Sequence, residues 1–362
     1  MRFIQSMKGV PMKRREFLKV AGATAGTYSL ASKGLLAARH AASTGADEVA
    51  GLPRRVLGRT GEKISIVAFP GLALNRLEQD EGTPGLHKAF EQGINHFDVA
   101  PAYGSSEVKM GIGLQGLDRS RIFLSCKTKM RDKDGARQEL ERSLTRLKTD
   151  YFDLYQMHHI RTPEEVKQAL GPGGAIETFL KAKEEGIIHH IGFSAHTTRG
   201  ALEMMKGFEF DSVMFPISYV DYLNWGFGKA VIEMAQERGV AVLAMKAIYA
   251  GSWPQGATRT RKWWYRPLEK DDEIDLALRF ALSQPGVVTT VPVSYLDLTD
   301  KCVKAARSYR PITEADMPKL HALATGCGSV FRKEDERVRM GRALLGPFHP
   351  DSPHECCPFA NA

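Results

Sequence analysis

The stretch INHFD at residues 94–98 is a short apolar run that ends on a charged residue, Asp98. Two later stretches follow the same plan: RIFLSCK at 121–127 ends on Lys127, and DLYQMH at 153–158 ends on His158. The gaps between the three polar residues are 29 and 31 positions, about the length of one strand-helix unit. Because the carboxyl ends of successive parallel strands meet on one face of an α/β sheet, this spacing predicts that the three side chains share a site.

The same alternation of strand and helix patterns continues along the chain. Eight apolar runs are expected to be strands, at 64–69, 94–98, 121–126, 153–157, 187–193, 212–216, 240–245 and 287–291. Helical patterns lie between them, at about 83–92, 105–115, 135–148, 173–185, 198–206, 227–238 and 271–283. The pattern predicts an α/β fold, a (β/α)8 TIM barrel over residues 47–310, followed by a C-terminal helical extension and tail at 311–362. An open, doubly wound sheet is the alternative.

The composition is that of an ordinary soluble protein. Of 362 residues, 43% are hydrophobic and 25% are charged. The net charge is +8, but eight Lys and Arg residues against Glu16 already give residues 1–45 a charge of +7, which leaves +1 for the rest. A globular part so close to neutral offers no electrostatic surface for nucleic acid, and no nucleic-acid partner is expected.

Nothing in the sequence predicts a metal centre or a disulfide framework. The chain has five cysteines, an odd number, and no C-x-x-C pair. Cys126 lies within an apolar run and is expected to be a buried thiol, while the role of the adjacent Cys356 and Cys357 stays open. His189 and His190 are neighbours in an expected strand and therefore face opposite sides of the sheet.

The amino terminus has the pattern of a targeting signal. Residues 13–19, KRREFLK, precede a weakly apolar stretch at 20–38 that is rich in Ala, Gly, Ser and Thr. Paired arginines before a soft hydrophobic segment resemble a twin-arginine export signal, so residues 1–46 are predicted to be a signal peptide and linker. The resemblance implies the twin-arginine machinery as a partner and a bacterial periplasmic location after signal removal. Lys33 interrupts the stretch, so no stable membrane insertion is expected.

A long connection follows the seventh expected strand, at residues 249–267, and carries Trp253, Trp263, Trp264 and Tyr265. Long loops at the carboxyl face of a barrel usually cover a substrate or cofactor, and this segment is expected to do so. The alternative is an aromatic patch packed against the outer helices.

The residues at the strand ends suit the reduction of a carbonyl. Tyr103 lies five positions after Asp98 and has a hydroxyl whose reference pKa is near 10. The Lys127 ammonium is expected to lower the pKa of this phenol, with Asp98 holding the lysine in place. His158 is then available to hydrogen-bond the substrate oxygen, while Tyr103 gives a proton to the developing alkoxide and a cofactor gives the hydride.

These motifs resemble the aldo-keto reductase family. The likeness includes F-D-x-A-x-x-Y-G at 97–104, D-L-Y-x-x-H at 153–158, I-G-F-S at 191–194 and V-P at 291–292. It implies a (β/α)8 barrel, a nicotinamide cofactor and a small-molecule carbonyl substrate. It also implies four catalytic residues, which are Asp98, Tyr103, Lys127 and His158.

The resemblance is weaker where the family holds its cofactor. It implies that Ser194 contacts the carboxamide and that Met245 replaces an aromatic ring that stacks on nicotinamide. Lys246 follows Met245 and is expected to meet a pyrophosphate. Ser294 is retained after the eighth strand, but Val293 and Thr299 stand where many members place cations for the 2′-phosphate of NADPH. NADPH or NADH is therefore expected, with NADPH slightly preferred from the resemblance. These changes also leave an alternative open, in which the barrel is a catalytically weak nucleotide- or ligand-binding sensory protein.

Overall fold

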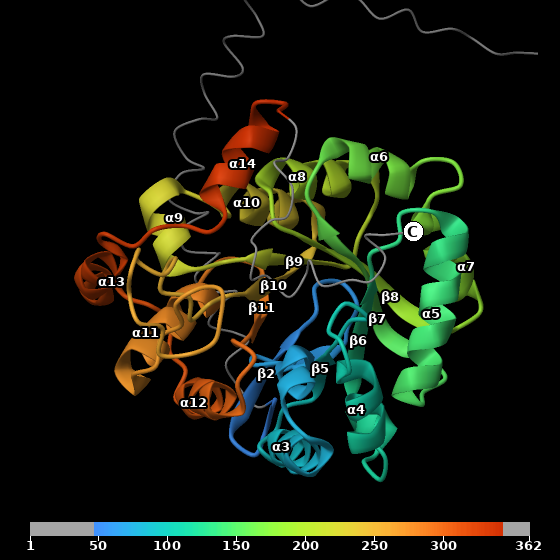
Figure 1. The fold of residues 1–362 in the computed structure, drawn as a ribbon, viewed down its shortest axis with the longest axis horizontal. Helices are drawn as coiled ribbons and strands as arrows, with labels where there is room; N and C mark the ends of the chain where they lie inside the picture. Colours follow the sequence, from blue (N-terminus) through green and yellow to red (C-terminus); the bar gives the residue numbers. More distant parts are fainter. Residues whose placement is uncertain (1–46, 343–362) are drawn as a thin grey trace, which may run out of the picture. The chain divides into compact units, whose positions relative to one another are not determined.

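The computed structural model of this chain describes residues 47–342. The expected export signal at residues 1–46 and the adjacent Cys356 and Cys357 lie outside the described residues. Within them, one parallel barrel carries nearly all of the chain (Figure 1). No helix of this part is long and apolar enough to cross a membrane.

Eight parallel strands form the barrel. They are β4 (Phe69–Pro70), β5 (His96–Asp98), β6 (Phe123–Thr128), β7 (Phe152–Ile160), β8 (Ile188–Ala195), β9 (Ser212–Pro216), β10 (Ala241–Met245) and β11 (Val287–Val291), each paired with its sequence neighbour. The ring closes just before β4, where the Ala68 N–H donates to the Thr290 carbonyl and the Thr290 N–H donates to the Ile66 carbonyl, both at 2.9 Å. The predicted (β/α)8 TIM barrel is confirmed, and the open sheet is excluded.

The first predicted strand, 64–69, is in fact two separate strands. Its first half is β3 (Lys63–Ser65), which pairs antiparallel with β2 (Leu52–Val56), itself paired with β1 (Glu48–Val49). The Ser65 hydroxyl donates to the Val67 carbonyl at 2.7 Å, while the Ser65 N–H donates to the Asn95 side chain at 2.7 Å. These bonds turn the chain from the small sheet into the barrel, a bend that apolar alternation alone does not reveal.

Helices cover the outside of the barrel between the strands (Figure 1). They are α3 (Gln79–Glu91), α4 (Ser106–Gly113), α5 (Lys133–Leu147), α6 (Pro163–Leu170), α7 (Ala175–Glu184), α8 (Thr198–Gly207), α9 (Tyr219–Trp225), α10 (Lys229–Arg238), α11 (Asp271–Leu282) and α12 (Leu296–Arg307). The short helices α6 and α9 were not among the predicted elements. Each begins at a capping hydroxyl, because Thr162 accepts from the Glu165 N–H and Ser218 accepts from the Asp221 N–H.

Two further helices follow α12. After a 3-10 turn at Glu314–Asp316, α13 (Met317–Ala324) packs near α9, and α14 (Arg332–Arg339) packs near α8 (Figure 1). The almost fully buried Arg279 of α11 fastens this segment, since its guanidinium donates to both carboxylate oxygens of Asp316, at 3.2 and 2.6 Å. The chain after the barrel therefore returns to the outer helices and to the mouth of the barrel.

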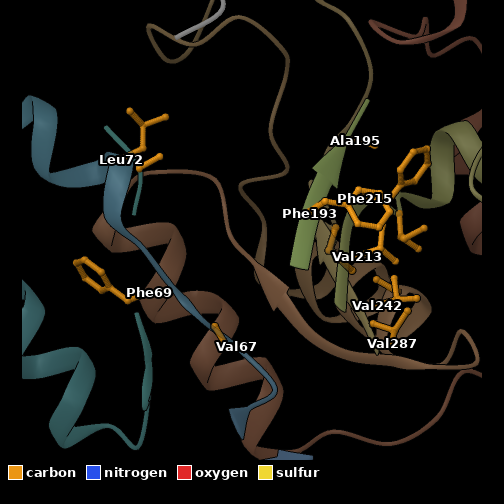
Figure 2. Close-up of a cluster of buried hydrophobic side chains, with 14 of the residues drawn as sticks. Val67, Phe69, Leu72, Phe193, Ala195, Val213, Phe215, Val242 and Val287 are labelled. Carbon is orange, nitrogen blue, oxygen red and sulfur yellow. The ribbon is translucent and has the colours of Figure 1, made fainter. Parts of the chain in front are cut away.

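Strand alternation divides the core into two layers. Along β8 and β9, Phe193, Val213 and Phe215 belong to the large apolar cluster shared with the helices, as Figure 2 shows. Met214, between two of them, belongs to a smaller cluster inside the barrel, with Met245 of β10. Burying each large apolar side chain contributes about 1.5–3 kcal/mol, so the outer layer fixes the strands while the inner positions are left for the site.

Candidate functional site

A buried ion pair joins the ends of β5 and β6. Asp98 and Lys127 are 2% and 0% exposed, and the Lys127 Nζ lies 2.5 Å from the Asp98 Oδ2. The ammonium also donates to the Val99 carbonyl at 3.1 Å. Burial, the largest single effect, disfavours the charged amine, but the charge and hydrogen bond of Asp98 together with the neighbouring Tyr103 outweigh it, and the pKa of Lys127 is raised. Lys127 is therefore cationic at neutral pH, although water does not reach it.

Tyr103 lies in the loop after β5, and its ring centroid is 5.1 Å from the Lys127 Nζ. Burial raises the pKa of Tyr103 to about 12, while the charge and hydrogen bond of Lys127 lower it and the charge of Asp98 raises it again. Lys127 lowers this pKa, as expected, but burial and Asp98 together exceed the effect of the lysine, and the pKa lies above its ordinary value. The phenol is consequently protonated at neutral pH, the form that donates a proton.

His158 lies near the end of β7 and completes the group. Its ring meets the Tyr103 ring edge-on, with centroids 5.7 Å apart and an interplanar angle of 86°. The pairing of β7 with β8 is irregular between Met157 and Ile160, and His159 takes a left-handed φ of 60° there. The His159 ring packs against the His196 ring, 4.3 Å between centroids, so the two neighbouring histidines have different surroundings. All four residues at the predicted strand ends and loop are thus brought together.

A small cavity opens beside this group. Its volume is about 60 Å³, and its lining includes Asp98, Tyr103, Met245, Lys246 and Ser294. Binding sites for small molecules usually measure several hundred Å³, whereas a cavity of this volume holds only a few water molecules. Five of the eight predicted site residues therefore line one space, and that space is nearly filled by protein.

The aromatic segment at 249–267 fills much of this cavity. Trp263, Trp264 and Tyr265 line the cavity and are between 2% and 5% exposed. Phe331, which follows the barrel by some distance in sequence, contacts the edge of Trp264 and the ring of His196. Part of this connection thus lines the cavity, together with a residue from the later segment that the sequence did not indicate, while its covering of a substrate or cofactor stays a prediction.

Ser194 lies at the end of β8 and does not line the cavity. Its Oγ accepts the His159 N–H at 2.8 Å, which leaves the hydroxyl hydrogen as a donor. Ser194 is thus held against the irregular part of β7, next to His158. Its predicted contact with a carboxamide stays a prediction.

Lys246 is the second buried lysine of the barrel mouth. It follows β10 with a left-handed φ of 63°, and its Nζ lies 5.4 Å from the Trp264 ring centroid and 5.3 Å from that of Phe331. Burial lowers the pKa of Lys246 to about 7, against the opposing charge of Asp221. Burial also raises the pKa of Asp221 to about 6. Among residues 47–342 no carboxylate contacts this buried amine, which fits an incoming phosphate that would supply the missing charge.

The residues two positions before three of the site residues were missed by the sequence interpretation. His96, Ser125 and Gln156 precede Asp98, Lys127 and His158 respectively, and all three are fully buried. The signal was present, because residues i and i−2 of a strand point to the same face. A polar residue at each of these positions predicts a polar layer beneath the site.

The described thiols have no place in this site. Cys126, Cys302 and Cys327 are free, and burial raises the pKa of Cys126 and brings that of Cys302 to about 12. Among residues 47–342, no three side chains of the His, Cys, Asp or Glu type gather as metal ligands would.

Comparisons with known proteins agree on one family. A sequence model of the Aldo/keto reductase family matches residues 68–324. An uncharacterized oxidoreductase, YqkF of Bacillus subtilis, is 31% identical over 307 residues, which is 74% of this chain and 95% of that protein. The solved structure of aldo-keto reductase AKR11C1 from Bacillus halodurans, in its holo form, superposes with a TM-score of 0.62 at 24% identity, over 76% of this chain and 98% of that one. A Bombyx mori aldo-keto reductase in complex with NADP superposes with a TM-score of 0.57 at 19% identity, over 75% and 92% of the two chains.

Proposed function

Because the chain belongs to the aldo/keto reductase family, we propose that it reduces an aldehyde or ketone, with Tyr103 as the proton donor. The observation that carries the proposal is a protonated, buried phenol on the cavity wall beside a buried cation. A general acid must hold its proton until the transition state and then meet a charge that stabilises the product anion. Tyr103 and Lys127 are arranged for these two requirements.

The family makes the protein an NAD(P)-dependent oxidoreductase. When bound, the nicotinamide supplies the hydride. We propose that Met245 lies against the cofactor ring, that Lys246 and Ser294 bind its phosphate-bearing part, and that Ser194 contacts the carboxamide. The residues present fit such a group, since they offer an apolar wall, a buried cation and hydroxyl donors. The volume of the cavity fits it only if Trp263–Tyr265 move aside.

Each of the other catalytic candidates has a role in the proposed reaction. As the carbonyl oxygen gains charge, Tyr103 transfers its proton and the O–H bond of the alcohol forms. The phenolate left behind lies beside the Lys127 ammonium, which Asp98 holds in place. His158, edge-on to the phenol, is placed to hydrogen-bond the same substrate oxygen. Proton transfer of this kind contributes roughly 10²–10⁴-fold to a rate.

We propose NADPH as the preferred cofactor, with NADH also used. Lys246 supports phosphate binding at neutral pH, when about half of its amines are protonated. Val293 and Thr299 are neutral and 1% and 3% exposed, so they offer no cation to a 2′-phosphate. Strong discrimination between the two nucleotides is therefore not expected. The nucleotide released from natively purified protein, identified by mass spectrometry, tests this choice.

Tyr103→Phe tests the reaction. Wild-type protein is expected to reduce members of a panel of small aldehydes with NADPH or NADH, and the variant to lose at least about 100-fold in kcat. Tyr155→Phe is the matched control, because it removes a hydroxyl from another buried tyrosine, one that does not line the cavity. If neither wild type nor variant turns over any carbonyl while both bind nucleotide, the reductase proposal fails and the sensory alternative takes its place.

We also propose that the protein is exported by the twin-arginine route to the periplasm of a bacterium. The support is the sequence Lys13-Arg14-Arg15 before the weakly apolar stretch. Changing both Arg14 and Arg15 to Lys is expected to keep the protein in the cytoplasm, as measured by cell fractionation. Equal fractionation of wild type and variant would rule the export route out.

A further inference from the structure

A fully buried polar layer lies directly beneath the proposed catalytic group. His96 of β5, Ser125 of β6 and Gln156 of β7 are each 0% exposed, and each lies two residues before a site residue on the same strand. The strand register brings them together, since Asp98 pairs with Ser125 and Lys127 pairs with Gln156. Polar side chains inside a barrel are costly unless they are hydrogen-bonded, so their contacts indicate what they do.

Their contacts converge on the carboxylate of Asp98. The Ser125 hydroxyl donates to the Asp98 Oδ1 at 2.8 Å, and the Gln156 amide donates to the same oxygen at 3.4 Å. The Asp98 Oδ2 is left for the Lys127 ammonium. The two oxygens therefore have separate partners, and a rotation of the carboxylate that weakened the lysine contact would also break the serine bond.

Ser125 is in turn held by His96. The His96 Nε2 lies 3.0 Å from the Ser125 Oγ. A hydroxyl has one hydrogen, and with that hydrogen on Asp98 the Ser125 oxygen is an acceptor, so the His96 Nε2 must carry a proton. Burial lowers the pKa of His96 to about 4, against the charge of Asp98 and with the charge of Lys127. The ring is neutral, and its one proton is thereby assigned to Nε2.

The surroundings of the other ring nitrogen of His96, Nδ1, also favour a proton on Nε2. The His96 Nδ1 is buried and has no hydrogen-bond partner among residues 47–342. An N–H at that position would be a buried donor without an acceptor, which costs more than a bare nitrogen in an apolar setting. The hydrogen bonds thus run in one direction, from His96 to Ser125 to Asp98.

We propose that Ser125, oriented by neutral His96, is a positioning residue that fixes Asp98 and, through it, the Lys127 ammonium against the Tyr103 phenol. The inference rests on the proposed carbonyl reduction for its effect on rate. It does not rest on that reaction for the hydrogen-bond order, which is a property of the folded protein. A displacement of about 1 Å in a catalytic group can cost up to about 100-fold in rate.

The kinetic test compares three variants. Ser125→Ala is expected to lower kcat about tenfold with KM for the carbonyl changed less than about twofold, because the substrate does not touch Ser125. Ser125→Thr keeps the hydroxyl and is expected to recover most of kcat. Ser212→Ala is the matched control, since it removes a hydroxyl from a fully buried serine of β9 that has no hydrogen bond to Asp98 among the described residues. Equal kcat in Ser125→Ala and Ser212→Ala would overturn the proposal. A folded Ser125→Thr variant whose kcat is as low as that of Ser125→Ala would also overturn it.

A second measurement keeps the proposal testable if these variants do not fold. Nitrogen-15 NMR of histidine-labelled wild type, with His96→Gln used to assign the His96 signals, is expected to show a neutral ring protonated at Nε2. A proton at Nδ1, or a charged ring at pH 7, overturns the hydrogen-bond order and the proposal with it. If the Nε2 tautomer is found but wild type reduces no carbonyl, the proposed function fails while the order of the hydrogen bonds stands.

Discussion

Two buried lysines face the same barrel mouth, and their surroundings differ. Lys127, on the β5–β7 side, contacts the Asp98 carboxylate, and its pKa is raised. Lys246, after β10, faces two aromatic rings, and its pKa is lowered to about 7. Both are buried, so the partner decides the direction of the shift. The β5–β7 side holds a lysine paired with a carboxylate, whereas the β10 side holds a lysine that contacts no carboxylate among residues 47–342 and is only about half protonated at neutral pH.

This difference separates the two tasks of the site. The proposed acid and its supporting pair are held by strand ends and a polar layer, so they are preorganised before any ligand arrives. The proposed cofactor side is bounded by Trp263–Tyr265 and Phe331, which come from connections rather than from strands. Connections move more readily than barrel strands, so we expect ligand binding to rearrange this side and leave the other unchanged.

The largest expected effect comes from removing one member of the buried pair. Lys127→Met leaves the Asp98 charge buried and uncompensated, which should cost about 3–5 kcal/mol of unfolding free energy. Catalysis should fall by roughly 10²–10⁴-fold as well, because the phenolate loses its neighbouring cation. Denaturant unfolding and kcat measure the two effects.

The matched control is the other lysine. Lys246→Met removes an amine that contacts no carboxylate in the described part of the chain, so it should leave the unfolding free energy unchanged or raise it. Adding Asp98→Asn to Lys127→Met should restore much of the stability but none of the activity. If the two single lysine variants lose equal stability, the contrast between the two sides of the mouth is not real.

The next largest expected effect is the pH dependence of nucleotide binding. In the proposed role of Lys246, a phosphate would bind its protonated form, and the pKa of this amine is about 7 before binding. Above pH 7 the free protein increasingly holds a neutral amine, so binding must take up a proton, and the Kd for NADPH should rise up to about tenfold per pH unit. Lys246→Arg stays charged throughout and should abolish this slope. Fluorescence titration between pH 7 and 9 measures it and avoids the titration of Asp221 near 6.

Lys127 gives the contrast for this experiment, because its protonation does not change over the same pH range. The pKa of Lys127 is raised, so Lys127 keeps its charge over the same range and should contribute no slope. A wild-type Kd that does not vary between pH 7 and 9 would mean that Lys246 does not meet a phosphate. The loss of the slope in Lys246→Arg is the result that assigns it to this lysine.

The sequence predicted the residues on the β5–β7 side of the barrel mouth better than the contacts on the β10 side, and the reason is physical. Asp98, Lys127 and His158 each follow a strand at a regular spacing, and regular spacing is a local property that a sequence carries. The direction of the Tyr103 pKa depended on burial, which is set by side chains from distant parts of the chain. The contact of Phe331 with His196 likewise joins segments far apart in sequence, and no local pattern indicates it.

The smallest expected effect comes from loosening the aromatic cover. Trp264 is 2% exposed and lines the cavity that a nicotinamide would enter, so the closed arrangement competes with binding. Trp264→Ala should destabilise the fold by about 3–5 kcal/mol but bind nucleotide up to about tenfold more tightly, because less free energy holds the cover shut. In wild type, nucleotide should shift tryptophan emission as Trp263 and Trp264 change surroundings, and Trp225→Phe removes the background of the exposed indole. Weaker binding by Trp264→Ala would instead make this ring part of the cofactor contact, and the β10 side would then be as preorganised as the catalytic one.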